Sequence, residues 1–431
     1  MSLKLILEKL LYFLIPASLI TIIIGNFMVI GHMAVHNIGL AVMGACVIAD
    51  ACIHRTLKFY IPLGHILPWA CILLLYVIQI LLHDETAHDI KYFLGFKTVW
   101  AGYAFTLALL PFQSKKIYFL LFKIFILTCF CISVFVIYKY IYLIVIGHGD
   151  AYIHPTWRNF IDMLYPFIIP FKIVHHTLGL FSILSVYFLY YLLKEEEKSS
   201  FMSLFYRVLM VFFVLFIHFI SSRLIIGILY TGIIIVLFNS YKENKISVRS
   251  LVLATASLIL LLFTAYLTIP TFKNKINFTV LNKIEPNEIV VTETHYKNLR
   301  LISHKVGLEA TKKYFWTGTG FGKENTIFED LNKKYFEDPD LWKLRPHNQF
   351  LYNTATMGVP LALVFILLFY SPLVFIKNKI QQPLTLLFIC ISAYFFTDCA
   401  LQLKQFFVFI AFWVPFLLHF YLSLTVDKGN A

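Results

Sequence analysis

Three residues could carry out chemistry because each stands beside an apolar run rather than within a general run of charge. Arg223 lies in the segment FISSRLII, Arg300 lies in KNLRLI, and His347 lies in LRPHNQF. Arginine is permanently charged, and its planar fork binds two phosphate oxygens at once. Histidine can remove a proton from a sugar hydroxyl near neutral pH. Together these residue types suit a phosphate-bearing substrate and a proton transfer.

Further polar residues are weaker candidates for the same site. Asp398 and Lys404 flank a short turn, Arg345 stands two positions before His347, and His176 lies on another predicted outer loop. Structural interpretations stay open for all of the candidates. The arginines could simply reach water at a membrane surface, His347 could cap a helix, and Asp398 with Lys404 could form an ion pair.

The composition indicates which elements must position these residues. Of the 431 residues, 60% are hydrophobic and 14% are charged, whereas soluble domains average about 45–50% apolar and about 25% charged residues. The excess apolar surface therefore predicts an all-α integral membrane protein. A net charge of +13 is expected from the basic cytoplasmic loops of such a protein, so it does not indicate a nucleic-acid partner.

Apolar stretches of spanning length, about 20 residues, predict about twelve transmembrane helices. They lie near 10–31, 36–53, 61–82, 94–112, 117–146, 171–193, 204–221, 224–240, 250–270, 349–370, 383–397 and 403–424. The predicted organisation is a nine-helix region (1–270), one large loop (271–347) and a three-helix region (348–431).

The loop at 271–347 differs from the rest of the chain. It holds 13 Lys/Arg and 10 Asp/Glu and has no run of spanning length. Apolar residues recur at helical spacing within 296–314, at Leu299, Ile302, Val306, Ala310 and Tyr314. Because a structureless loop of this length is unusual, we expect a small subdomain of short helices.

Basic residues in the short loops predict the orientation. They gather in alternate loops, at Arg55, Lys58, Lys115, Lys116, Lys194, Lys198, Arg207, Lys242, Lys245, Arg249, Lys377 and Lys379. The positive-inside rule makes these loops cytoplasmic. Both termini are then cytoplasmic, and the large loop with the candidate residues is extracytoplasmic.

The sequence contains Gly318-x-Gly320-x-Gly322, which resembles a phosphate loop only superficially. It has neither the spacing of a P-loop nor a preceding strand, so a tight turn is the better interpretation. The seven cysteines all lie outside the large loop, and no HExxH or GxSxG motif occurs. We therefore expect no metal site and no cofactor.

Three fragments, in this order, resemble the O-antigen ligase family of bacterial inner-membrane glycosyltransferases. The first is Ser222-Arg223 before an apolar helix, and the second is Arg300, then Gly307, then the glycine turn. The third is His347-Asn348 with Gly358 downstream. Two positions differ from the family pattern: Leu361 replaces a second glycine, and no proline precedes the glycine turn.

The resemblance implies a function and a role for each residue. The family transfers a glycan from an undecaprenyl-pyrophosphate carrier to a sugar hydroxyl of lipid A–core, at the periplasmic face of the inner membrane and without a metal. Arg223 and Arg300 would hold the pyrophosphate, and His347 would be the base that leads to inversion. An O-antigen polymerase or a protein O-oligosaccharyltransferase on the same scaffold stays open, as does a lipid-linked glycan transporter or flippase.

Overall fold

The computed structural model describes residues 3–27, 32–83, 87–143, 145, 175–195, 199–220, 223–242, 244, 246–268, 273, 290–321, 323–337, 339–376 and 383–429. Every regular element within these ranges is a helix. The predicted all-α class is thereby confirmed.

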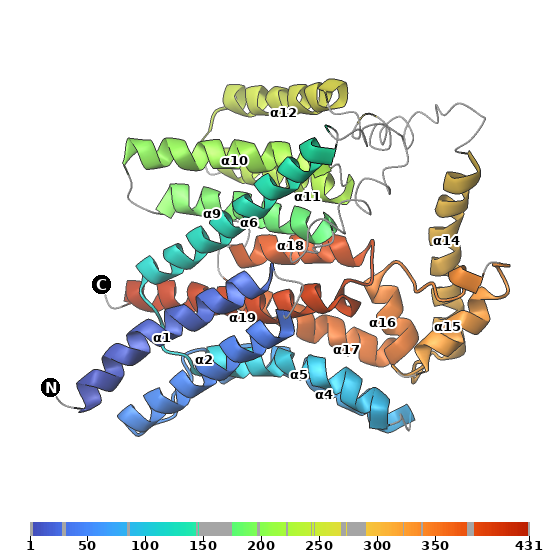
Figure 1. The fold of residues 1–431 in the computed structure, drawn as a ribbon, viewed down its shortest axis with the longest axis horizontal. Coiled ribbons are helices and arrows are strands. Elements are labelled where there is room, and N and C mark those ends of the chain that lie inside the picture. The colour runs from blue at the N-terminus through green and yellow to red at the C-terminus, as the bar shows by residue number, and fades with distance from the viewer. Residues whose placement is uncertain are drawn as a thin grey trace.

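Nine helical segments in the described ranges are long and apolar enough to cross a membrane. They are α1 (Leu3–Gly25), α2 (His32–His54), α3 (Leu63–Ala70) with α4 (Ile72–His83), α6 (Lys115–Leu143), α9 (His175–Glu195), α10 (Ser200–Ile220), α11 (Arg223–Lys242), α12 (Val248–Thr268) and α19 (Lys404–Gly429). The bundle also contains α5 (Ala87–Leu109), α17 (Val359–Tyr370), η5 (Ser371–Phe375) and α18 (Pro383–Phe395) (Figure 1). The total of twelve spans stays a prediction.

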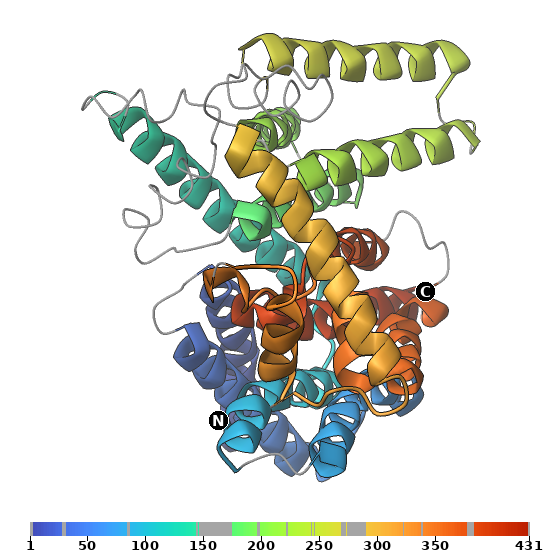
Figure 2. The same ribbon diagram turned by 90° about the vertical axis from the view of Figure 1, so that its right-hand side faces the viewer.

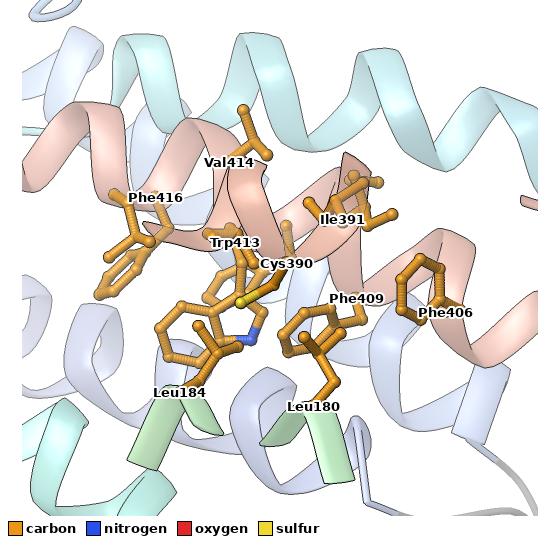
Figure 3. Close-up of a cluster of buried hydrophobic side chains, with 14 of the residues drawn as sticks. Leu180, Leu184, Cys390, Ile391, Phe406, Phe409, Trp413, Val414 and Phe416 are labelled. Carbon is orange, nitrogen blue, oxygen red and sulfur yellow. The ribbon is translucent and has the colours of Figure 1, made fainter. Parts of the chain in front are cut away.

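The centre of the bundle lies where α9, α18 and α19 meet. Aromatic and aliphatic side chains interlock there, among them Phe409, Trp413, Leu180 and Cys390 (Figure 3). The span of α19 is 89% buried and that of α9 is 83% buried, whereas that of α12 is only 6% buried. Helices that are apolar on all sides are either buried or face lipid, so α19 forms the core and α12 lies at the edge.

A small subdomain of helices lies at one end of this bundle. It consists of α14 (Val290–Lys313), α15 (Glu324–Asn332), η4 (Pro339–Leu341) and α16 (Gln349–Met357). Figure 1 shows that α1 begins and α19 ends at the opposite end of the bundle, and Figure 2 shows α14 lying across the face of the subdomain end. Helices α14 and α15 lie within the predicted large loop, and α14 buries Leu299, Val306 and Ala310 as their spacing predicts. The domain division at 271–347 stays a prediction.

The predicted tenth span, 349–370, is wrong as a single helix. It is two helices, α16 and α17, which are separated by Gly358. The backbone of Gly358 has φ 77° and ψ 158°, a combination that is essentially restricted to glycine and that cannot continue an α-helix. His347 therefore precedes a short helix of the subdomain rather than a spanning helix.

Candidate active site

One face of α14 packs against α16 and ends near His347. Arg300, His304, Gly307 and Thr311 share this face because they are three or four residues apart. A Cβ at Gly307 would lie 2.8 Å from side-chain atoms of both Leu351 and Pro346, so only glycine permits this approach. Farther along, the hydroxyl oxygens of Thr311 and Thr354 are 3.1 Å apart.

The backbone around His347 is held from two sides. His304 Nε2 lies 3.2 Å from the His347 carbonyl oxygen. The next residue, Asn348, caps α16: its side-chain oxygen accepts a hydrogen bond of 2.9 Å from the Leu351 amide. Asn348 rather than His347 is therefore the helix cap, which leaves the imidazole, 34% exposed, available for another role.

The imidazole of His347 faces a carboxylate. Its Nδ1 lies 3.6 Å from Asp398 Oδ1, which also accepts a 2.7 Å hydrogen bond from the Cys399 amide. Asp398 thus contacts His347, whereas the Lys404 side chain lies outside the described side chains. At this separation the two groups attract each other when the imidazole is protonated, but they do not form a hydrogen bond.

The segment that carries Asp398 is attached to the segment that carries His347. The Cys399 thiol donates a hydrogen bond to the Pro346 carbonyl. Burial, and then the nearby Asp398 carboxylate, raise the pKa of this thiol, so it stays a protonated donor. This contact holds the turn that carries Asp398 close to the segment that carries His347.

The short helix η7 (Ala400–Gln402) is held at Leu401 from two further elements. The buried Gln349 side chain accepts a 2.8 Å hydrogen bond from the Leu401 amide. Lys97 Nζ of α5 donates a 3.1 Å hydrogen bond to the Leu401 carbonyl. Lys97 is fully buried and lies 3.9 Å from the centre of the Phe407 ring. The turn between α18 and α19 is therefore rigidly connected to both the subdomain and the bundle.

Arg345 is positioned by residues of α15. Its guanidinium donates a 2.8 Å hydrogen bond to Asn325 Oδ1 and lies 3.5 Å from Glu324 Oε1. Glu324 is buried, and the Tyr352 hydroxyl also donates to it at 3.1 Å. Burial raises the pKa of Tyr352, which stays protonated as a donor. The positive charge of Arg345 is thus compensated within the protein.

A cavity of about 610 Å³ opens beside His347. Its lining comes from α15, from the segment before α16 and from the turn between α18 and α19. The lining residues are Asn325, Glu329, Lys343, Arg345, Pro346, His347, Asp398, Cys399, Gln402 and Leu403. Apart from Pro346, Leu403 and Cys399, they are polar or charged.

The glycine-rich turn after α14 has a structural role. The amides of Thr319 and Gly320 donate to the carbonyls of Ala355 and Thr356, at 2.9 and 3.1 Å. A phosphate loop needs amides that point freely at the ligand, and these two are already used. The interpretation as a tight turn is confirmed for Gly318 and Gly320, and Gly322 lies outside the described residues.

The structure also places the predicted arginines. Arg300 is exposed on α14, one turn before His304. Arg223 begins α11, after α10 has returned toward the subdomain end (Figure 1). The side chains of Arg223 and His176 lie outside the described side chains, so the pairing of Arg223 with Arg300 stays a prediction. Among the described residues, no group of three or more His, Cys, Asp or Glu could hold a metal ion.

The segment that carries this geometry also matches a known family. Residues 208–366 match the family model described as O-antigen ligase. The resemblance read from the sequence is confirmed for this segment. It includes Arg223, Arg300 and His347, whereas Asp398 and Lys404 lie beyond it. A search of curated proteins gives no match.

The O-antigen ligase match supports glycosyl transfer of the ligase or polymerase type, with a lipid-linked glycan and a glycan acceptor as the kinds of substrate. Sequence reasoning missed several residues of the site, namely His304, Asn325, Glu329 and Gln402. His304 could have been found, because it lies one helical turn after Arg300. The others come from distant segments, and no spacing rule connects them to His347.

Proposed function

We propose that this protein is an O-antigen ligase-type glycosyltransferase of the bacterial inner membrane. It moves a glycan from undecaprenyl pyrophosphate to a sugar hydroxyl of lipid A–core at the periplasmic face. The observation that carries the proposal is the approach of His347 Nδ1 to Asp398, next to a helix that presents Arg300, with His347 and Arg300 both inside the segment that matches the O-antigen ligase family.

The reaction is a single displacement at the anomeric carbon. His347 Nε2 takes the proton from the acceptor hydroxyl while its oxygen forms the new bond to the anomeric carbon. The bond from that carbon to the pyrophosphate oxygen breaks on the opposite side, which inverts the configuration. Asp398 stabilises the imidazolium that forms, and it orients the ring through Nδ1.

The leaving pyrophosphate gains negative charge as this bond breaks. Arg300 on α14 and Arg223 at the start of α11 supply the compensating positive charge, a role that needs no metal ion. The carrier's apolar chain would lie among the bundle helices or in the adjacent lipid.

The distribution of charge supports the proposed orientation. Lys115 of α6 lies 3.4 Å from Glu195 at the end of α9, and Tyr118 bonds to His419 near the end of α19. The basic loop at Lys115 therefore lies at the end of the bundle where the chain terminates. The positive-inside rule favours a cytoplasmic position for this end, and this supports the proposal that the subdomain and His347 face the periplasm.

Transfer by the purified protein tests the proposal. The protein is mixed with carrier-linked glycan and lipid A–core, without metal or nucleotide, and the product is measured. We expect transfer, and the His347→Ala variant should lose about 10²–10⁴-fold of the rate. His54→Ala, which changes a histidine at the other end of the bundle, is the matched control.

The molecule that receives the glycan distinguishes the ligase from the other enzymes that share this scaffold. Transfer to a second carrier-linked glycan instead of lipid A–core would make the protein a polymerase, and transfer to a protein hydroxyl would make it a protein O-oligosaccharyltransferase. Movement of lipid-linked glycan across vesicles without any transfer would contradict the proposal in favour of a transporter.

A further inference from the structure

The cavity beside His347 is lined by apolar surface and by polar side chains, and several of its charges are paired within the protein. Glu329 lies 3.2 Å from Lys333, and Arg345 is held by Glu324 and Asn325. Asp398 faces His347. Lys343 also lines the cavity and adds a positive charge, so the lining suits a polar ligand that offers hydrogen-bond acceptors.

The lining residues provide hydrogen-bonding groups and apolar surface, which are the contacts that a sugar ring makes with a protein. Carboxylates accept hydrogen bonds, while the amides of Asn325 and Gln402 can both donate and accept them. Apolar surface, to which Pro346 and Leu403 contribute, makes up the larger part of the lining and suits the C–H face of a ring. At about 610 Å³, the cavity is within the range of about 300–1,000 Å³ typical of small-molecule sites.

Helix α14 approaches the His347 segment, but none of its described side chains lines the cavity. His304 reaches the His347 carbonyl from α14, whereas the lining comes from α15, from the segment before α16 and from the turn between α18 and α19. Arg300 is therefore not part of the lining, and the proposed phosphate site and the cavity use different residues.

We propose that this cavity is the acceptor subsite and that it binds a hydroxyl-rich sugar ring whose reacting hydroxyl points at His347. The proposal rests on the proposed function and assigns a place to its acceptor. Gln402 contributes to recognition: its side chain lines the cavity from η7, and it is close in the chain to Leu401, which Gln349 and Lys97 hold in place.

Gln402→Leu tests the subsite, because leucine has a similar size and no hydrogen-bonding group. We expect the KM for lipid A–core to rise about 3–10-fold, the usual effect of one neutral hydrogen bond, with the KM for the carrier-linked donor and kcat within about twofold. Asn325→Asp should act in the same direction, since it keeps an acceptor for Arg345 and loses the amide donor. Asp330→Asn is the control, because Asp330 is on the same helix, outside the lining, and pairs with Lys333.

A binding measurement keeps this inference separate from the transfer assay. The probe is the core oligosaccharide released from lipid A and stripped of phosphate, added to the intact protein in the absence of donor. Binding by the wild type that weakens in Gln402→Leu supports the subsite, even if the protein never transfers glycan. Unchanged binding and KM in both cavity variants, or a raised KM for the donor instead of the acceptor, would overturn it.

Discussion

At the scale of single residues, the contact between His347 and Asp398 depends on how the turn between α18 and α19 is held against Pro346. Arg300 and His347 could be predicted, because a charged or titratable residue beside an apolar run is costly unless it has a purpose. The partner of Asp398 could not be predicted in this way. Its neighbour in sequence is Lys404, yet the carboxylate faces His347 because Cys399 joins the turn to Pro346.

Asp398→Asn tests this pair. The amide keeps the size of the carboxylate but removes the negative charge that stabilises the imidazolium. We therefore expect kcat to fall by roughly 10–100-fold, less than the loss on removing the base itself, with the KM for both substrates nearly unchanged. Steady-state transfer kinetics measure this, and an unaltered kcat would mean that Asp398 only holds the turn.

Arg300 is exposed on α14, and its proposed role is to bind the pyrophosphate of the donor. Arg300→Ala should lower the rate of transfer by about 10–100-fold, the usual effect of a hydrogen bond between charged groups. Arg300→Lys should recover little, since an ammonium cannot reproduce the planar fork. Lys312→Ala, an exposed cation at the other end of α14, is the control. Full recovery by lysine would show that only a positive charge near the lipid headgroups is needed.

At the scale of elements, α14, the glycine turn and α16 form one packed unit. A Cβ at Gly318 would collide with the Thr356 carbonyl, and one at Gly358 would lie 2.5 Å from the Trp316 carbonyl oxygen. Val359 donates a 2.8 Å hydrogen bond to the Phe315 carbonyl across the same contact. The glycines that marked the family resemblance therefore set how closely the turn approaches α16.

The break at Gly358 was missed because hydrophobic periodicity carries no information about backbone angles. The sequence does contain a local signal for the break, because Pro360 follows two residues after Gly358. Glycine is common just after the end of a helix, and proline is common in the first turn of a helix. By contrast, α14 was predicted well, because its buried residues repeat at helical spacing along a polar helix.

Gly358→Ala should destabilise this unit. The backbone conformation costs a non-glycine residue about 1–3 kcal/mol, and the contact with Trp316 adds to that cost. We expect a clear fall in the thermal denaturation temperature of the purified protein and faster proteolysis between α14 and α16. Gly227→Ala, where a Cβ would meet no atom within 4 Å, should leave both nearly unchanged. Equal stability of the two variants would contradict the described packing.

At the scale of the whole molecule, composition and the lengths of the apolar runs predict the all-α membrane class. Backbone polar groups in lipid must bond within the protein, so an apolar run of spanning length forms a helix. The relative placement of the helices could not be predicted in this way. Lipid-facing and core helices are equally apolar, and nothing in the sequence distinguishes the edge helix α12 from the central α19. Only their packing separates them, at 6% and 89% buried.

The placement of the two ends of the molecule across the membrane is the last prediction. The turn after α2 contains Lys58, and the Tyr60 amide that follows bonds to the Ala108 carbonyl near the basic loop at Lys115. Lys312 stands on α14 at the subdomain end (Figure 1). The positive-inside rule makes the first end cytoplasmic and the second periplasmic.

One added cysteine at each of these two positions reports the orientation. Lys312→Cys and Lys58→Cys are introduced separately after Cys52, Cys71 and Cys131, the cysteines that are not buried, are replaced by serine, and spheroplasts are treated with a membrane-impermeant maleimide. We expect labelling of the cysteine at 312 only, and labelling of both after lysis, which confirms that each thiol is reactive. If the cysteine at 58 is labelled instead, the site faces the cytoplasm, where the proposed periplasmic transfer to lipid A–core could not take place.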